Sequence, residues 1–285
     1  MSDRPVRRIS VLGAGTMGHG IAHAAAAAGY DTCLYDVSET QLAKGRATIE
    51  SVFGKAVELG KASAVEMDAV LNRLETTTDL ARAVSGTDFV IEAAPERIDL
   101  KLQLMADIDR HAPAGAIVTT NTSALSVTEI ASASSNPSRV AGMHFFNPVH
   151  RMKLVEIVRA LESSAETLAA VDAVARRMGK ETVVVRESPG FITTRVNASI
   201  GNEAFYMLME GVASARDIDK ALKLGLNHPM GPFELVDLVG LDTRLSILEY
   251  LHRSLGEKYR PCPLLVQYVR AGRLGRKVGR GVYEY

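Results

Sequence analysis

A histidine and a glutamate on two neighbouring strand-like segments are the residues of this sequence best suited to chemistry. His144 lies in residues 142–148, which read GMHFFNP, and Glu156 follows twelve residues later in residues 153–158, KLVEIV. An imidazole accepts a hydroxyl proton near neutral pH, and a carboxylate at its second ring nitrogen holds the tautomer and stabilises the imidazolium. The pair therefore predicts a general base with a supporting carboxylate.

Each of these two residues also has a purely structural interpretation. A histidine in an apolar strand is often a hydrogen-bonded core residue without a chemical role, and the chain has seven histidines. Glu156 alternates with Leu154 and Val158, so it would equally fit the solvent face of a strand. The sequence alone leaves these alternatives open.

A second chemical motif lies near the start of the chain, where a glycine-rich turn joins an apolar segment to an alanine-rich one. The stretch GAGTMG, which begins at Gly13, matches G-x-G-x-x-G. Gly13 permits the tight turn, Gly15 lets a pyrophosphate approach the backbone, and Gly18 lets the following helix sit close to the sheet. The pyrophosphate would rest on the helix N-terminus, which brings Thr16 and Met17 into the expected cofactor site.

An acidic residue completes this motif. Asp36 follows eighteen residues after Gly18, at the end of the strand-like residues 32–35. Such a carboxylate accepts hydrogen bonds from the adenosine ribose, and its charge repels a 2′-phosphate. The motif therefore predicts NAD rather than NADP as the cofactor. The alternative is a glycine-rich turn followed by a solvent-exposed aspartate that binds nothing.

The elements that must carry these residues are strands alternating with helices in the first two thirds of the chain. Strand-like segments occur at residues 9–12, 32–35, 89–92, 117–120, 140–145, 154–158 and 182–185. Capping patterns predict helix starts at Ser38, Ser63, Ser126 and Ser163. This alternation is typical of an α/β fold with a Rossmann-type, mostly parallel sheet.

Two departures from simple alternation set the domain organisation. A helical stretch from Ser38 to Leu74 is broken near residues 60–62, which predicts a helical hairpin inserted after the second strand. Beyond the last strand the pattern changes, and helices are expected at residues 195–211, 215–225, 232–255 and 263–271. We therefore expect an NAD-binding α/β domain at residues 1–186 and an all-helical C-terminal domain at residues 187–285.

Composition excludes several classes of protein. The chain has 33 basic and 33 acidic residues without a basic block, so no nucleic-acid partner is expected. No apolar run is long enough to span a membrane, and the first strand begins too early to leave room for a targeting peptide. The two cysteines suggest a reducing compartment rather than a disulfide framework, and no metal site is expected. These observations predict a cytoplasmic protein.

Taken together, these segments resemble the L-3-hydroxyacyl-CoA dehydrogenases, including the short-chain 3-hydroxybutyryl-CoA dehydrogenases. The resemblance extends almost from end to end and rests on collinear segments at residues 13–18, 120–123, 143–148, 153–156, 188–192, 229–233 and 272–277. It implies NAD-linked, reversible oxidation of the 3-hydroxyl of an acyl-CoA to a ketone.

The resemblance also implies roles for individual residues. It makes His144 the general base and Glu156 the carboxylate that orients it. Ser123 is implied to lie near both substrate and nicotinamide, and Asn147 to line the same pocket. Three further positions are implied to contact the cofactor: Glu96, Lys101 and Asn121. Ser123 and Asn147 would also fit a loop as turn-forming residues. Glu96 and Lys101 would fit a helix start as ordinary charges.

Two positions depart from the family pattern. Thr194 stands where the family commonly has an asparagine near the substrate carbonyl, and its hydroxyl lacks the geometry of an amide. In the expected hairpin, Glu58 stands where the family often has a lysine that contacts CoA. Ser51 is retained there, and Lys55 and Lys61 lie close by. The expected substrate contacts are therefore Ser51, Lys55, Ser123, Asn147 and Thr194.

These departures leave two other functions open. The changes at Glu58 and Thr194 would suit a related NAD-dependent dehydrogenase that acts on a CoA-free hydroxy acid, such as L-gulonate. A non-catalytic NAD-binding protein of the same fold is the second alternative. Retention of both His144 and Glu156 favours an enzyme over this second alternative.

The helical domain carries more apolar positions than one contact with the cofactor domain would bury. This surplus predicts homodimerisation through the helical domain, as in the family. The positions concerned are Leu235, Val236, Leu238, Leu241, Leu245 and Leu248.

Overall fold

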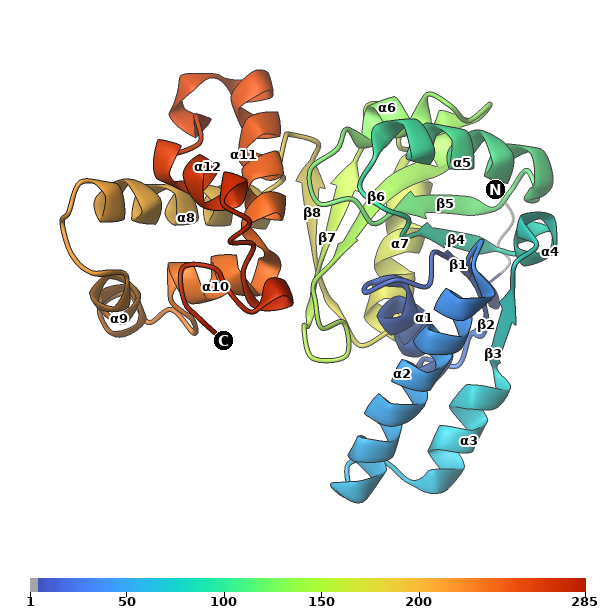
Figure 1. Ribbon diagram of the computed structural model, residues 1–285. Helices are drawn as coiled ribbons and strands as arrows, with labels where there is room; N and C mark the ends of the chain where they lie inside the picture. Colours follow the sequence, from blue (N-terminus) through green and yellow to red (C-terminus); the bar gives the residue numbers. More distant parts are fainter. Residues whose placement is uncertain (1–4) are drawn as a thin grey trace. The chain divides into compact units, whose positions relative to one another are not determined.

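The chain divides into two compact units, the first ending at Glu187 and the second covering Ser188–Tyr285 (Figure 1). The computed structural model describes residues 5–285. The first unit is built on one sheet with helices around it, and the second is built from helices. This confirms the predicted fold class, an α/β unit followed by a helical one.

The sheet of the first unit has eight strands in the order β3-β2-β1-β4-β5-β6-β7-β8. Neighbouring strands are parallel except β6 and β7, which pair antiparallel. The strands are β1 (Arg8–Leu12), β2 (Asp31–Tyr35), β3 (Leu74–Thr77), β4 (Phe89–Glu92), β5 (Ile117–Thr120), β6 (Val140–Phe145), β7 (Leu154–Arg159) and β8 (Glu181–Arg186). Only β3 was not expected, because its sequence LETT has a weak apolar pattern and the strand lies at the edge of the sheet.

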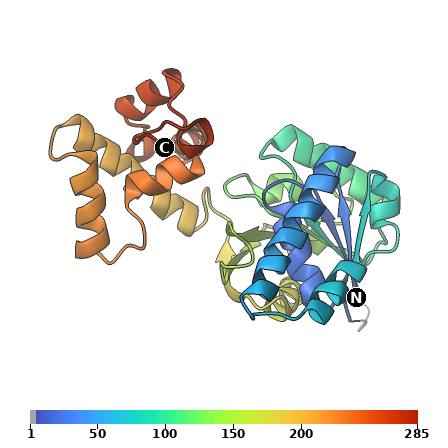
Figure 2. The same ribbon diagram turned by 60° about the horizontal axis from the view of Figure 1, so that its bottom comes forward.

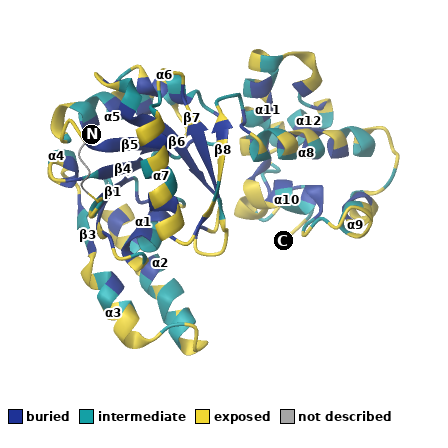
Figure 3. Cartoon of the chain, turned by 180° about the vertical axis from the view of Figure 1, so that it is seen from behind, coloured by how far each residue is buried: buried dark blue, intermediate teal, exposed yellow. Residues whose placement is uncertain are grey.

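Helices cover both faces of this sheet (Figure 2). Strand side chains alternate between two cores. The core that includes Ile9, Ile91 and Phe145 packs against α1 and α7. The opposite core, which includes Val90 and Val118, packs against α4, α5 and α6. These helices are α1 (Gly18–Ala27), α4 (Leu80–Val84), α5 (Ile98–His111), α6 (Val127–Ala131) and α7 (Ala165–Arg177). Figure 3 shows the resulting burial of the central strands.

The predicted helical hairpin is present, and it projects from the sheet (Figure 1). It consists of α2 (Glu39–Glu58) and α3 (Ala64–Asn72). Ser63 and Glu66 form a complete capping box, in which each side chain satisfies a free backbone donor of the other residue. Gly60, with φ +67°, allows the chain to turn between the two helices.

The helix start predicted at Ser163 is wrong by one residue. Ser164 is the N-cap of α7, and its side chain accepts a hydrogen bond from the Thr167 backbone N–H. Ser163 instead donates its hydroxyl proton to the Val140 carbonyl, 2.6 Å away. Two adjacent serines fit the capping pattern, and a contact with a distant strand decides between them.

The second unit contains five α-helices: α8 (Thr193–Met209), α9 (Ala215–Gly225), α10 (Pro232–Val239), α11 (Leu241–Leu255) and α12 (Pro263–Arg270). The single helix expected at residues 232–255 is wrong, because Gly240 adopts φ +104° and separates α10 from α11. Phe205 and Phe233 pack edge to face in the core of this unit, with ring centroids 5.2 Å apart. Across residues 5–285, each helix is too short or too polar to cross a membrane.

The apolar surplus expected in the helical unit is largely used inside the unit itself. Val236, Leu241 and Leu248 are buried in its core, and Leu245 packs against them. Of the six positions that suggested an outward surface, Leu238 is the one that is exposed, at 51%. The argument for a dimer from those six residues is therefore wrong in its particulars, because α10 and α11 each bury one face against neighbouring helices.

Candidate active site

The predicted base and carboxylate meet across the antiparallel pair β6 and β7. The register of the two strands places His144 directly opposite Glu156. His144 Nδ1 lies 2.8 Å from Glu156 Oε2, within hydrogen-bond distance. Their side chains are 6% and 1% exposed. The solvent-face interpretation of Glu156 is therefore wrong, since the residue points into the molecule on the same face of the sheet as His144.

This geometry fixes the chemistry available to the imidazole. A carboxylate that accepts from Nδ1–H holds the neutral ring in one tautomer, in which Nε2 is the basic nitrogen. The ring of Phe146 lies beside the imidazole, with centroids 4.5 Å apart. An imidazole held in this way could accept a proton without having to reorient, because its hydrogen-bond partner and its packing both constrain the ring.

The glycine-rich turn has the close approaches that a dinucleotide fold requires. A Cβ at Gly18 would lie 1.6 Å from the Gly13 carbonyl oxygen, so the start of α1 packs directly on the turn. Gly13 has φ +108°, and a Cβ there would lie 2.7 Å from the Ala93 carbonyl oxygen. A Cβ at Gly15 would meet nothing within 4 Å, which leaves its backbone open to a ligand. The turn thus fits a pyrophosphate on the N-terminus of α1.

Asp36 belongs to the same turn structurally. Its Oδ2 accepts the backbone N–H of Ala14 at 2.8 Å, and its Oδ1 accepts that of Ser38 at 2.9 Å. Each carboxylate oxygen has a second lone pair, so ribose hydroxyls can still donate to it. Asp36 is half-buried and tied to the glycine turn, which differs from the exposed, unattached aspartate of the alternative interpretation.

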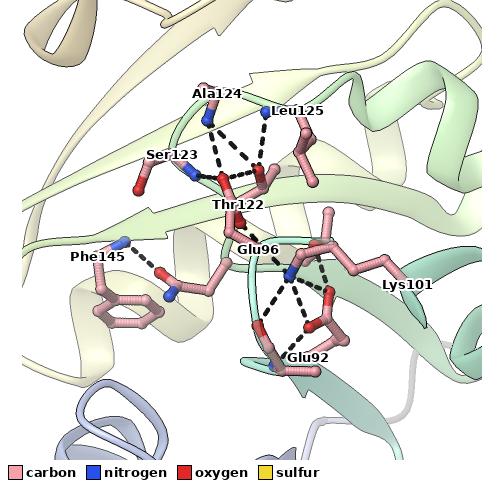
Figure 4. A network of polar contacts seen from close by, with 11 residues as sticks. Glu92, Glu96, Lys101, Thr122, Ser123, Ala124, Leu125 and Phe145 are labelled. Carbon is pink, nitrogen blue, oxygen red and sulfur yellow. Dashed lines mark hydrogen bonds and ion pairs between the residues drawn. The ribbon is translucent and has the colours of Figure 1, made fainter. Parts of the chain in front are cut away.

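A buried ion pair joins Glu92, the last residue of β4, to Lys101 on α5 (Figure 4). Lys101 Nζ donates to both oxygens of Glu92, at 2.8 and 2.9 Å, and to the Ala94 carbonyl oxygen at 3.2 Å. The Thr120 hydroxyl donates to Glu92 Oε2 at 2.5 Å. Lys101 was predicted to contact the cofactor, and its ammonium group is engaged chiefly by Glu92.

Sequence reasoning missed Glu92. Its signal is a carboxylate that ends the apolar strand β4, FVIE, where a charge must find a partner. Nothing local identifies that partner, because Lys101 lies on α5, across the loop that follows β4.

Glu96 organises the loop that carries Ser123 (Figure 4). Its Oε1 accepts the Thr122 hydroxyl at 2.6 Å, the Ser123 backbone N–H at 2.8 Å and the Ala124 backbone N–H at 3.2 Å. Glu96 therefore does more than start a helix. Asn121 precedes this loop, and its Oδ1 accepts the Phe145 backbone N–H at 2.8 Å, which ties the loop to the strand of His144.

The remaining predicted site residues are more dispersed. Asn147 is exposed just after β6, and its peptide bond to Pro148 is cis. Ser51 is exposed on α2, and Lys55 follows it one turn later on the same helix. Thr194 lies in the first turn of α8, in the helical unit. Substrate contacts for these four residues stay predictions.

The first unit contains a pocket of about 960 Å³ between the hairpin and the segment that follows β6. Its wall is largely apolar and includes Phe53, and basic side chains also line it, among them Lys55, Lys153 and Arg177. His23 faces the pocket from α1, and burial lowers the pKa of its imidazole to about 4. The charges of His150, His19 and Lys180 act in the same direction. The pocket therefore combines apolar surface with positive charge, which suits a long ligand that carries phosphates.

No group of three or more histidine, cysteine or acidic side chains within residues 5–285 is arranged to hold a metal ion. The described residues provide a histidine within hydrogen-bond distance of a carboxylate, a glycine-rich turn at a helix start, and a basic, partly apolar pocket.

Comparison with known proteins finds relatives over nearly the whole length of this chain. Family models described as the NAD-binding domain and the C-terminal domain of 3-hydroxyacyl-CoA dehydrogenase match residues 8–188 and 190–285. A probable 3-hydroxybutyryl-CoA dehydrogenase of Bacillus subtilis is 47% identical over 281 residues, 98% of each chain. A 3-hydroxybutyryl-CoA dehydrogenase of Bradyrhizobium diazoefficiens is 43% identical, over 98% of this chain and 96% of the relative. The crystal structure of (S)-3-hydroxybutyryl-CoA dehydrogenase from Ralstonia eutropha superposes with a TM-score of 0.95 at 43% identity, covering 98% of this chain and 99% of that one.

Proposed function

Because the chain belongs to the 3-hydroxyacyl-CoA dehydrogenase family and is an NAD-dependent oxidoreductase, we propose that it oxidises L-3-hydroxybutyryl-CoA reversibly to the 3-keto thioester. The names of the Bacillus and Ralstonia relatives specify this four-carbon substrate. The observation that carries the reaction type is the buried hydrogen bond between His144 and Glu156. It supplies a base on the same sheet as a dinucleotide turn, and oxidation of an alcohol by NAD requires both.

In this proposal His144 removes the proton of the substrate hydroxyl through Nε2. Glu156 holds Nδ1 and stabilises the imidazolium that forms. Bound NAD supplies the hydride acceptor. Ser123 contributes its hydroxyl to the substrate oxygen, and Glu96 fixes the Ser123 backbone in place for that purpose.

The cofactor is held, in this proposal, by the glycine turn and by the loops after β2, β4 and β5. Asp36 binds the adenosine ribose, and the N-terminus of α1 binds the pyrophosphate. The other contacts proposed are Gly13, Gly15, Thr16, Met17, Gly18, Glu96, Lys101 and Asn121. The fit of the glycine turn, described above, supports this arrangement.

The basic, partly apolar pocket supports a CoA ester over a free hydroxy acid. Phosphates of CoA would meet Lys55 and Lys153, while apolar groups such as Phe53 would pack along the rest of the ligand. A free C4 hydroxy acid would fill little of a pocket of about 960 Å³. Glu58 does not line this pocket, so its negative charge does not weigh against CoA binding there.

A comparison of CoA-linked and free substrates tests the proposal. We expect the purified protein to oxidise NADH rapidly with acetoacetyl-CoA and at least a hundredfold more slowly, by kcat/KM, with free acetoacetate. The physical reason is that binding energy from the CoA portion lowers the barrier at the reacting carbon. Equal rates would favour the CoA-free alternative, and no turnover across acyl-CoA esters from C4 to C16 would favour a non-catalytic NAD-binding protein.

We further infer that the enzyme acts as a homodimer in the cytoplasm. Exposed apolar side chains of the helical unit support the dimer, notably Leu224, Leu226 and Val212. Cys33 and Cys262 are both free thiols, which is in keeping with a reducing compartment.

A further inference from the structure

The ion pair beside the cofactor turn belongs to a cluster with one uncompensated negative charge. Lys101 Nζ lies 2.8 Å from Glu92 Oε1 and 3.8 Å from Glu96 Oε2, so two carboxylates share one ammonium group (Figure 4). The side chains of Lys101 and Glu92 are 0% and 2% exposed, and that of Glu96 is 42% exposed. Solvent and salt screen the buried pair far less than surface charges, and they screen the half-exposed Glu96 in part.

The cluster is attached directly to the glycine turn. Glu92 is the last residue of β4, and its Oε1 accepts the Ala94 backbone N–H at 2.6 Å. The Ala93 carbonyl oxygen is the atom that a Cβ at Gly13 would strike. The charges therefore lie at the carboxyl end of β4, immediately beside the turn that receives the cofactor.

Sheet order indicates which half of the cofactor lies near this cluster. β1 and β4 are neighbours, and the chain leaves them toward opposite sides of the sheet, which makes their carboxyl ends the dinucleotide crevice. Asp36, at the end of β2, marks the adenosine side. The nicotinamide half must then extend over β4 and β5, toward His144. Glu96, which holds the Ser123 backbone, lies on that side.

We propose that the net charge of Glu92, Lys101 and Glu96 makes the enzyme bind NAD⁺ more tightly, relative to NADH, than a neutral cluster would. Oxidised nicotinamide carries a positive charge, and the reduced ring is neutral. The negative charge left over in the cluster, on the half-exposed Glu96 beside the buried pair, stabilises only the oxidised form. The inference rests on the proposed direction of the nicotinamide and concerns affinity, so it does not depend on the role of His144 in proton transfer.

Equilibrium binding of both cofactor forms tests this inference. Kd for NAD⁺ and for NADH is measured by fluorescence titration on the full chain, for the wild type, Glu92→Gln and the double variant Glu92→Gln/Lys101→Met. Glu92→Gln leaves a neutral cluster, so the ratio Kd(NAD⁺)/Kd(NADH) is expected to rise by about threefold to tenfold. The double variant again has one negative charge, on Glu96, and its ratio is expected to return to within about twofold of wild type.

Two further variants separate charge from structure. Glu96→Gln neutralises the cluster at its half-exposed member and is expected to raise the ratio in the same direction, even if variants of the buried pair do not fold. Asp99→Asn removes a carboxylate that is 65% exposed on the same helix as Lys101, and the ratio should stay unchanged. This matched control measures the effect of a screened charge.

Failure of this inference about cofactor affinity can be told apart from failure of the proposed acyl-CoA oxidation. An unchanged ratio in folded Glu92→Gln and Glu96→Gln would overturn the inference, as would a double variant whose ratio resembles that of Glu92→Gln. A protein that binds both cofactors with the expected ratios and yet has no acyl-CoA turnover would refute the proposed function and leave this inference intact.

Discussion

The chemistry proposed at the scale of single residues depends on how His144 is held. Glu156 occupies one ring nitrogen from the neighbouring strand, and the ring of Phe146 packs beside it. Two constraints on one imidazole leave little freedom of rotation, so the proposed base would be in position before substrate binds. In the proposed mechanism, the same carboxylate would compensate the positive charge that proton transfer creates in a buried place.

Replacing the base tests this assignment. His144→Gln should lower turnover with acetoacetyl-CoA by about 10²- to 10⁴-fold, because a general base contributes about that factor. The dissociation constant for NADH should stay close to wild type. Glu156→Gln should lower turnover in the same direction, because the imidazolium loses its compensating charge.

The control for this substitution is a histidine with a comparable carboxylate contact elsewhere. His252 pairs with Glu257 at 3.0 Å in the helical unit. His252→Gln should leave turnover near wild type. A His144→Gln enzyme with near-normal turnover, measured by stopped assays of NADH consumption, would refute the assignment.

At the scale of elements, α1 links the cofactor turn to the pocket. Its first residue, Gly18, packs on Gly13, and His23, one turn after His19, lines the pocket. His23 packs against Phe53 of α2, with ring centroids 5.2 Å apart. Burial, followed by the charges of His150, His19 and Lys180, lowers the pKa of His23 to about 4, so this imidazole is neutral in the folded protein at neutral pH.

That lowered pKa makes stability depend on pH. The unfolded chain protonates His23 near its ordinary pKa of 6.5, while the folded protein does so only near 4. The unfolded state therefore binds more protons between these values, and the free energy of unfolding falls as the pH drops from about 6.5 to 4. The contribution is at most on the order of 3 kcal/mol.

His23→Gln should flatten this part of the pH profile. We expect the variant to lose less stability than wild type between pH 7 and pH 5, measured by urea unfolding followed by circular dichroism. His111→Gln, at an exposed position in the last turn of α5, is the control and should retain the wild-type profile. Identical slopes for the wild type and His23→Gln would show that this imidazole is not the source.

At the scale of the whole molecule, the two units have separate cores and separate uses of apolar surface. The α/β unit buries its strands between two helical layers. The helical unit has its own core around Phe205 and Phe233, and it leaves other apolar side chains outside, such as Leu224 and Leu226. An exposed apolar surface of this kind often marks a protein interface.

Light scattering tests the dimer proposed from that surface. At micromolar concentration, the measured molar mass should be about twice the 30.7 kDa of one chain. Leu224→Glu combined with Leu226→Glu should shift the mass toward that of a monomer, because two charges would have to be buried in the interface. Val37→Glu, at an exposed apolar position of the α/β unit, should leave the mass unchanged. A wild-type protein with a monomeric mass would contradict the proposal.

The sequence by itself determined those parts of the fold that depend on near neighbours. The glycine turn, the Ser63 capping box and the break at Gly60 each involve residues at most six positions apart in the sequence, so local chemistry predicts them. Apolar segments predicted seven of the eight strands, because the central strands are buried on both faces and carry a strong apolar pattern. The edge strand β8 is largely exposed, and its run of three valines gave the same signal. β3 escaped prediction because an edge strand of four residues needs little apolar content.

Only the tertiary structure decided what depends on sheet order and register. His144 and Glu156 are twelve residues apart in sequence, and the antiparallel register makes them opposite neighbours. Glu92 and Lys101 form an ion pair because α5 packs over the end of β4. Hydrogen bonds between separate elements require donor–acceptor distances to be correct within a few tenths of an ångström. Packing across the whole sheet sets those distances, and residues nearby in the chain do not.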